Sequence, residues 1–315
     1  MSGQIHASAV VPPTLDHVVG QPQVTNKLKV AVEAAFADQQ PLPHVMLTGP
    51  AGVGKTMIAQ VVAREMATEF REVIGQSLVN VASLNGFLLG ASEPRSILFC
   101  DEAHEIPASV QTALLKAVDE RAVYLCSDND SKISKLEIEP FTLVLATTDP
   151  QGLLEPLRDR MRIVCQLRRY APDDLVSVLR QKMMQLQWQV DEDVLTEISR
   201  RSFGTPRLAL RLLEAVRRSA RAAGATVIDA SHAKASFSLE ELDEIGLGPD
   251  ERAYMSILAD ASGPLRLGVI ASRMGQPPQA ISKVVESNLV WLGLIERSDR
   301  GRTLTAAGLS HIHSV

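Results

Sequence analysis

The first half of the chain alternates short apolar runs with longer stretches in which apolar residues recur at helical spacing. Short apolar runs bounded by turn residues are typical of buried strands, whereas helical spacing indicates a helix with one buried face. We therefore expect strands at residues 45–47, 97–100, 141–146 and 163–167, and helices at 24–37, 57–66 and 108–118. Strands that alternate with helices favour an α/β domain whose mostly parallel sheet is covered on both faces.

Residues 121–140 interrupt this alternation. Two strand-like segments there flank the polar stretch S-D-N-D-S at residues 127–131, a pattern that predicts a β-hairpin inserted before a core strand. We assign the hairpin to the first domain, residues 1–171.

The strand-like runs end after Pro172. Helical periods follow at residues 173–187, 192–201, 206–223 and 230–235, and they predict a small helical domain without strands over residues 172–245. A Gly-Pro break opens a third domain, residues 246–315, with helices expected at 250–258, 267–274 and 278–291. A strand, a tight polar turn and a second strand over residues 294–305 complete the pattern of a winged helix.

Composition adds few constraints. The chain has 315 residues, of which 45% are hydrophobic and 22% charged, as in ordinary globular proteins. Its net charge of −5 means that any contact with nucleic acid must come from a local basic patch. Cys100, Cys126 and Cys165 form no CxxC pair, and we interpret them as buried thiols in a reducing compartment. The N-terminus has no secretory pattern and no run is long enough to span a membrane, so we expect a soluble, cytoplasmic protein.

Residues 49–56 satisfy the phosphate-loop pattern G-x-x-x-x-G-K-[ST] between a predicted strand and a predicted helix. Glycines allow backbone N–H groups to converge on phosphate oxygens, and the helix N-terminus adds positive dipole. Lys55 is expected to bridge the β- and γ-phosphates of ATP, and the Thr56 hydroxyl to bind Mg²⁺. The alternative is a glycine-rich turn without a ligand. The other candidate nucleotide contacts are Gly49, Gly52, Gly54 and the backbone of Met57.

An acid pair follows the second buried strand, where the ligands of open α/β sheets bind. Asp101 is expected to hold Mg²⁺ through its water shell, and Glu102 to orient and deprotonate the attacking water. A solvated turn is the alternative for two adjacent acids. His104 fits a supporting role better than that of a base.

The third domain carries a cluster of cations in one turn, Arg297, Arg300 and Arg302. Such a cluster suits phosphate contact without base reading. The alternative is an ordinary solvated turn.

Longer phrases give the chain a resemblance from end to end. They are T-L-D-H-V-V-G-Q at residues 14–21, L-A-T-T at 145–148, G-L-L-E-P-L-R-D-R at 152–160, L-R-R-Y-A-P-D-D-L at 167–175, R-R-S-F-G-T-P-R at 200–207 and I-E-R-S-D-R-G-R at 295–302. In this order and spacing they resemble the RuvB family of AAA+ ATPases, the bacterial Holliday-junction branch-migration motors, or a divergent paralogue of it. The resemblance implies a homohexameric ring that hydrolyses ATP with Mg²⁺ and translocates duplex DNA in recombination and repair.

The resemblance also implies roles for single residues. Thr148, or its neighbour Thr147, corresponds to the polar sensor of the γ-phosphate. Arg160 corresponds to the arginine finger that reaches the nucleotide of the next subunit, with Arg158 as a second candidate. Tyr170 corresponds to a residue lining the nucleotide pocket of its own subunit.

Further positions carry over in the same way. Arg207 corresponds to a residue that reports γ-phosphate loss to the lid, and independently Thr205 and Pro206 read as the N-cap and first residue of its helix. Asp119, Glu120 and Arg121 stand where the family has Glu-Asp-Phe, near the nucleotide interface that two subunits share.

The predicted hairpin corresponds to the family's docking element for RuvA, the junction-binding protein, and RuvC resolvase is a further implied partner. The chain departs from the family at Val11, where the family has Arg, in the acidic hairpin tip and in residues 72–90. Two other functions stay open: a clamp-loader-like switch that loads a partner on DNA, and a non-catalytic winged-helix module that binds DNA.

Overall fold

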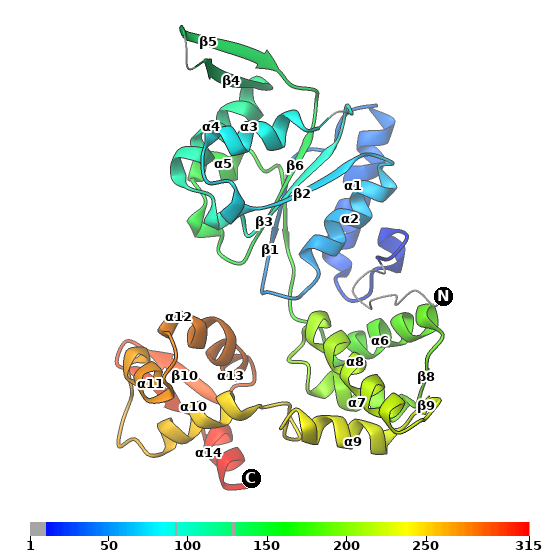
Figure 1. Cartoon of the computed structure of the whole chain (residues 1–315), viewed down its shortest axis with the longest axis vertical. Helices are drawn as coiled ribbons and strands as arrows, with labels where there is room; N and C mark the ends of the chain where they lie inside the picture. The colour runs from blue at the N-terminus through cyan, green and yellow to red at the C-terminus, as the bar shows by residue number, and fades with distance from the viewer. Residues whose placement is uncertain (1–10, 92, 128–129, 315) are drawn as a thin grey trace. The chain divides into compact units, whose positions relative to one another are not determined.

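The computed structural model of the chain describes residues 11–91, 93–127 and 130–314 (Figure 1). The chain divides into two compact units, residues 1–174 and 175–315. The tip residues 128–129 and the side chain of Cys126 lie outside what is described, whereas Cys100 and Cys165 are free and buried, as predicted.

A five-stranded parallel sheet forms the centre of the first unit, in the order β2-β3-β6-β1-β7. Its strands are β1 (Val45–Thr48), β2 (Phe70–Ile74), β3 (Ile97–Asp101), β6 (Thr142–Thr147) and β7 (Ile163–Gln166). The parallel α/β prediction is confirmed. The edge strand β2 was not predicted, because its exposed and half-buried residues form no apolar run.

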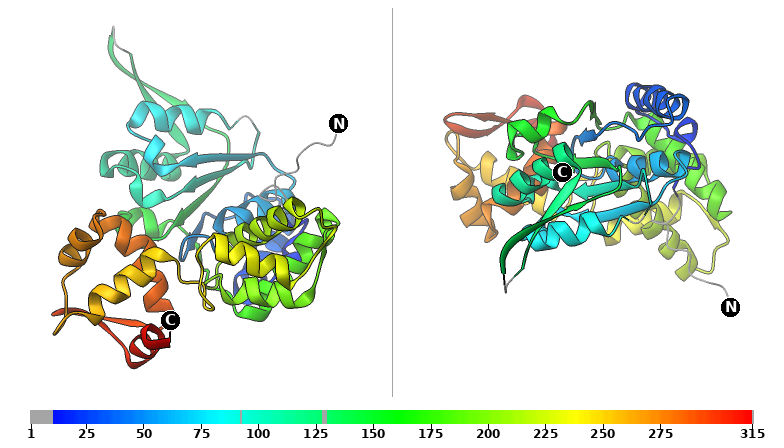
Figure 2. Two further views of the ribbon diagram at one scale, coloured as in Figure 1. Left: turned by 60° about the horizontal axis from the view of Figure 1, so that its bottom comes forward. Right: turned by 90° about the horizontal axis from the view of Figure 1, so that it is seen from above.

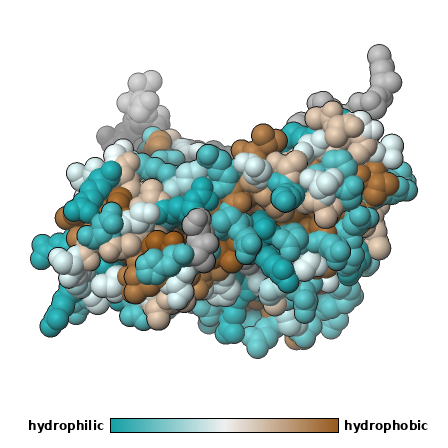
Figure 3. All heavy atoms as spheres, turned by 90° about the horizontal axis from the view of Figure 1, so that it is seen from below, coloured by the Kyte–Doolittle hydropathy of each residue, from teal (hydrophilic) through white to brown (hydrophobic). Residues whose placement is uncertain are grey.

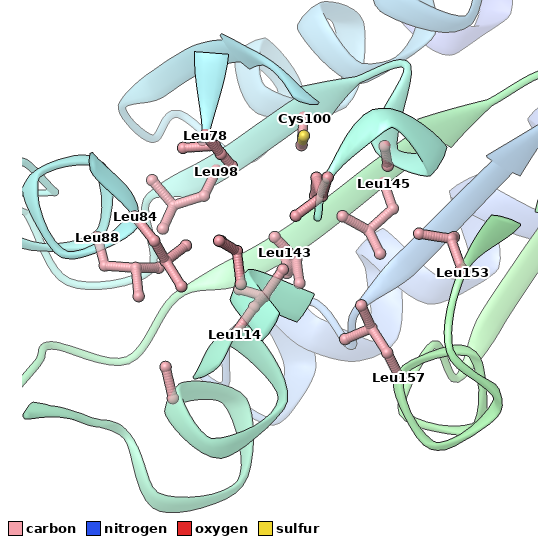
Figure 4. Close-up of a cluster of buried hydrophobic side chains, with 14 of the residues drawn as sticks. Leu78, Leu84, Leu88, Leu98, Cys100, Leu114, Leu143, Leu145, Leu153 and Leu157 are labelled. Carbon is pink, nitrogen blue, oxygen red and sulfur yellow. The ribbon is translucent and has the colours of Figure 1, made fainter. Parts of the chain in front are cut away.

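Helices cover both faces of the sheet, with α1 and α2 on one side and α3, α4 and α5 on the other (Figure 1). They are α1 (Pro22–Ala37), α2 (Lys55–Glu65), α3 (Val81–Leu89), α4 (Ala108–Glu120) and α5 (Glu155–Asp159). Figure 4 shows the leucines of α3, α4 and α5 packed against those of β3 and β6. This core fixes the strand ends that carry the candidate site.

The predicted hairpin is present as β4 (Ala122–Ser127) and β5 (Asp130–Glu137). It projects from the sheet of its unit (Figure 1, and Figure 2, left). At its base the Tyr124 hydroxyl donates to Glu120, and Lys116 Nζ lies 3.7 Å from the centroid of the Tyr124 ring. The base of the hairpin is therefore held to the last turn of α4.

The second unit begins at residue 175, within the first helix of a helical part made of α6 (Pro172–Leu186), α7 (Glu192–Arg200), α8 (Pro206–Ala222) and α9 (Ala230–Leu239). The expectation that strands are absent here is wrong. Gln189–Val190 (β8) and Val227–Ile228 (β9) pair in parallel after α6 and α8. Two residues are too few to leave a strand pattern in the sequence.

The winged helix is confirmed, with α10 (Pro249–Ala259), α11 (Leu267–Met274), α12 (Pro278–Ile281), α13 (Ser287–Trp291), β10 (Ile295–Ser298), β11 (Gly301–Leu304) and α14 (Ala306–Ser314). A π-helical segment, Ser282–Glu286, interrupts the helix that was expected as one piece. Phe203, from the helical part, lies in the same buried cluster as the winged-helix core. The predicted division of this unit near residue 246 therefore stays a prediction.

Polar and apolar side chains are interspersed over the face shown in Figure 3. Within the residues that the structure describes, no helix is both long and apolar enough to cross a membrane.

Candidate active site

The phosphate-loop pattern lies where β1 ends and α2 begins, at the carboxyl edge of the sheet. The loop glycines have positive φ angles, 141° at Gly49, 79° at Gly52 and 99° at Gly54. A Cβ atom at Gly49 would stand 2.4 Å from the Leu167 carbonyl oxygen, so a side chain there would displace backbone. The loop therefore presents bare backbone to a ligand, as phosphate binding requires.

The Lys55 ammonium lies inside this loop. It is only 6% exposed, and Nζ donates to the carbonyl oxygens of Gly49, at 2.9 Å, and Pro50, at 3.0 Å. A cation held by the loop's own carbonyls is in place for a phosphate that the loop's N–H groups bind.

Two oxygen donors meet beside the loop. Thr56, the second residue of α2, brings Oγ1 to 3.5 Å from Oδ2 of Asp101, at the end of β3. The other carboxylate oxygen of Asp101 accepts from the Glu102 backbone N–H at 3.0 Å. A hydroxyl and a carboxylate are hard oxygen ligands, and they fit the Mg²⁺ that the sequence predicts.

Glu102 adopts a left-handed backbone conformation, with φ 46° and ψ 48°. This conformation is costly for a residue with a side chain, and such residues cluster at functional sites. Thr148 Oγ1 donates to Glu102 Oε2 at 3.3 Å, whereas Thr147 is fully buried. Of the two candidate sensors, Thr148 is the one that contacts the acid pair.

Tyr170 packs against the loop from the first unit's last segment. Its ring lies so close to Gly20 that a Cβ there would meet Cδ1 at 2.7 Å, and its hydroxyl lies 3.9 Å from the Cβ position of Gly54. Burial raises the pKa of Tyr170 to about 12, so the phenol stays protonated at neutral pH. The Gln21 side chain joins the segment that contains Gly20 to the segment that contains Tyr170. Its Nε2 donates to the Arg168 carbonyl oxygen at 2.7 Å, and its Oε1 accepts from the Arg168 N–H at 3.1 Å.

Arg160 lies at the opposite, amino edge of the sheet. It follows α5, which runs back from the carboxyl edge, and β7 begins three residues later. Its guanidinium makes a bidentate pair with Asp119, Nε to Oδ1 at 2.6 Å and Nη2 to Oδ2 at 2.9 Å. The hydrogen bonds from Arg160 hold the pKa of Asp119 below its usual value.

The amino edge contains a cavity of about 390 Å³ beside this pair. Its charged lining is Asp119 with the guanidiniums of Arg121, Arg160 and Arg162. Burial lowers the pKa of His44, another lining residue, to about 4, so this imidazole is neutral at pH 7. Three cations face one anion, and the cavity is therefore suited to an anionic group.

The sheet separates this cavity from the phosphate loop of the same chain. Four residues of β1 alone span about 13 Å at about 3.3 Å per residue. The structure therefore does not bring Arg160 and residues 119–121 to the chain's own loop. Glu120 is instead bonded to Tyr124 and lies 3.7 Å from Lys135.

In the second unit, Arg207 stands at the start of a helix, as predicted. Thr205 is the N-cap of α8 and Pro206 its first residue, although the Thr205 hydroxyl bonds to Ser202 O at 3.0 Å and not to the helix. Arg207 is exposed. Its contact with nucleotide stays a prediction.

The wing arginines differ in their surroundings. Arg297 and Arg302 are paired across the two strands of the ribbon, and Arg300 is exposed in the turn between them. Arg302 Nε lies 2.6 Å and Arg297 Nε 3.6 Å from the carboxylate of Glu286, which is fully buried and also accepts from Tyr254 at 2.9 Å. Sequence reasoning missed this buried acid and assigned Arg302 wholly to phosphate.

A parallel sheet whose first strand runs into a phosphate loop, with an acid pair delivered to the same edge, is the architecture of P-loop nucleoside triphosphatases. The helical part that follows the sheet places the chain in their AAA+ class. Family models match in order: the Holliday junction DNA helicase RuvB P-loop domain at residues 10–167, the RuvB AAA lid domain at 170–243 and the RuvB C-terminal winged helix domain at 244–313. The chain belongs to the RuvB family.

Individual relatives are similar to this chain over most of its length. The Holliday junction branch migration complex subunit RuvB of Paramagnetospirillum magneticum is 37% identical over 305 residues, which cover 96% of this chain and 88% of that protein. The structure of the Thermotoga maritima RuvB Holliday junction branch migration motor is 30% identical, with a TM-score of 0.85 and coverage of 96% of this chain and 97% of that one. A mutant of the same Thermotoga protein has a TM-score of 0.86 at 30% identity, covering 96% and 99%.

Proposed function

We propose that the chain is the ATP-hydrolysing motor subunit that drives branch migration of Holliday junctions. The observation that carries the proposal is the placement of the loop and acid pair at one edge of the sheet and of Arg160 at the other. The family membership and the winged helix support a motor that acts on DNA.

In the proposed reaction, the loop backbone and Lys55 bind the phosphates of ATP. Thr56 and Asp101 are the residues that would hold Mg²⁺, which supplies neutralising charge to the phosphate oxygens when bound. Glu102 accepts a proton from the attacking water, and Thr148, bonded to Glu102, senses the γ-phosphate. Tyr170 lines the pocket and is a neutral donor there.

Arg160 acts on the nucleotide of a second copy in this proposal, because the sheet separates it from the loop of its own chain. Such an interface is heterologous, and a heterologous interface forms a ring when the rotation from one copy to the next closes on itself. We assign six copies to that ring from the family resemblance. Arg121, Arg160 and Asp119 then lie on the face that a neighbour's triphosphate approaches. Arg207 is assigned separately, to report loss of the γ-phosphate to the lid.

The DNA-binding surface is assigned to the wing, with Arg300 and Arg297 as the phosphate contacts. The hairpin β4–β5 is assigned to a RuvA-like junction-binding protein, and RuvC resolvase is a further proposed partner. We place this work in the cytoplasm.

The decisive experiment is ATP-dependent dissociation of a synthetic four-way junction by the purified chain, with and without RuvA. We expect dissociation with sustained ATP turnover that DNA stimulates. A single turnover for each loading event would instead support a clamp-loader-like switch, and ATP binding without hydrolysis would support a DNA-binding module.

Salt dependence separates the roles of the wing arginines. Arg300→Gln should lower the slope of log K against log salt by about 0.9, the loss of one phosphate contact. Arg302→Gln should leave the slope unchanged and lower the free energy of unfolding by about 1.5–3 kcal/mol, because the buried Glu286 loses a charged hydrogen bond. Duplex binding at several salt concentrations and denaturant melts measure both. Equal slope changes for the two variants would show that Arg302 also contacts a DNA phosphate.

A further inference from the structure

His104 lies next to the candidate base, in the short 3₁₀ turn Ala103–Glu105 that follows β3. Its side chain is 13% exposed. Nδ1 lies 3.0 Å from Thr147 Oγ1 and 3.4 Å from Glu102 Oε2, and Nε2 lies 3.5 Å from Glu105 Oε1. The imidazole therefore touches the carboxylate that is assigned to deprotonate water.

The bonds of Thr147 determine which ring nitrogen carries hydrogen. The Thr147 hydroxyl is 2.9 Å from the Asp149 carbonyl oxygen, to which it donates, and it accepts from the Asp149 N–H at 3.0 Å. A hydroxyl has one hydrogen and two acceptor lone pairs. Its hydrogen is used on the carbonyl oxygen, so the remaining contact with His104 needs a hydrogen from the imidazole. Nδ1 is therefore the protonated nitrogen.

The His104 ring is fixed by packing as well as by this bond. A Cβ atom at Gly152 would stand 2.8 Å from His104 Cβ, so the turn Pro150–Gly152 lies directly against the histidine. The buried side chain of Gln111 holds that turn, donating to the Gly152 carbonyl at 3.1 Å and accepting from the Leu154 N–H at 2.8 Å. The Nδ1–H edge thus has a set direction, toward Thr147 and Glu102.

One donor and the edge of the imidazole therefore lie on the same oxygen of Glu102. Thr148 Oγ1 donates to Oε2 at 3.3 Å, and Nδ1 of His104, whose hydrogen is bonded to Thr147, lies 3.4 Å from Oε2, where the positive N–H edge attracts the carboxylate. We propose that His104 is a positioning residue for ATP hydrolysis, which holds Oε2 of Glu102 so that Oε1 accepts the proton of the attacking water. The inference rests on the proposed function, since it needs Glu102 to be the base.

Isosteric substitutions test the two ring nitrogens separately. The amide of asparagine can place a donor where Nδ1 lies, and that of glutamine where Nε2 lies. His104→Ala and His104→Gln should lower the kcat of DNA-stimulated ATP hydrolysis by about 10–100-fold, as a misplaced reacting group does. The KM for ATP should not change, because His104 makes no contact with the phosphate loop in the proposal. His104→Asn should restore most of the lost kcat.

Melting curves of the three variants show whether each is folded, and Glu102→Gln is assayed beside them. A folded His104→Ala chain with full kcat, or equal activity of the Asn and Gln variants, overturns the positioning role while an inactive Glu102→Gln leaves the proposed function in place. A change confined to KM also overturns it. Undiminished hydrolysis by Glu102→Gln would remove the base itself, and the proposed mechanism with it.

Discussion

We expect Lys55→Ala to abolish ATP turnover, with kcat reduced by at least about 10²–10³-fold. This is the loss that follows removal of one preorganised charge or donor at a reacting centre. The reason is the position of Nζ, buried in the loop and bonded to the Gly49 and Pro50 carbonyls. Steady-state ATP hydrolysis with junction DNA measures the effect.

Lys234→Ala is the matched control, because it removes an exposed lysine from α9 in the other unit. It should keep wild-type turnover. The Lys55→Ala chain should still melt cooperatively and bind duplex DNA, since the wing is unchanged. Wild-type hydrolysis by a folded Lys55→Ala chain would falsify the assignment of the phosphate loop.

The sequence was sufficient for the loop and the strands that carry it. A glycine-rich pattern between an apolar run and a helical period allows few structures, and the buried strands β3 and β6 have the continuous apolar runs of a parallel sheet. The edge strand β2 has no such run, because one side of an edge strand is exposed. The pair β8 and β9 is too short to have any pattern.

The wing contains an ion pair that the order of residues along the chain does not predict. A two-residue turn places Arg297 directly opposite Arg302, and like charges in such a pair are destabilising. Two arginines in this register need a counter-ion, and the carboxylate of Glu286, in the preceding π-helical segment, supplies it. Its burial was not visible, because an acid in a helical period is normally exposed.

The place of Arg160, the proposed arginine finger, depends on topology more than on sequence distance. Arg160 is only 12 residues from Thr148, yet α5 carries the chain from one edge of the sheet to the other between them. In the same way, α4 carries the chain from the edge where Glu102 lies to the edge where Asp119 lies, at the end of that helix. Side chains at this edge lie far from the phosphate loop of their own chain, and the proposal therefore assigns them to the nucleotide of another copy.

Arg160→Ala should therefore be inactive alone, with a loss of about 10³–10⁵-fold, as for other arginine fingers. Its inactivity should be relieved when it is mixed with the Lys55→Ala chain. A site is complete only where an intact loop from the first variant meets an intact Arg160 from the second. In rings mixed at random from equal amounts, about one quarter of the interfaces meet this condition.

The mixture should then recover up to about one quarter of wild-type turnover if sites act independently. Arg158→Ala is the comparison, since Arg158 Nη1 donates to Gln151 at 3.0 Å and has no bond to Asp119 in the described structure. Sedimentation of the mixture tests whether the two inactive variants assemble together. Mixed assemblies that form and yet hydrolyse no ATP would exclude Arg160 as a finger in trans, whereas loss and rescue by Arg158→Ala would transfer the role to Arg158.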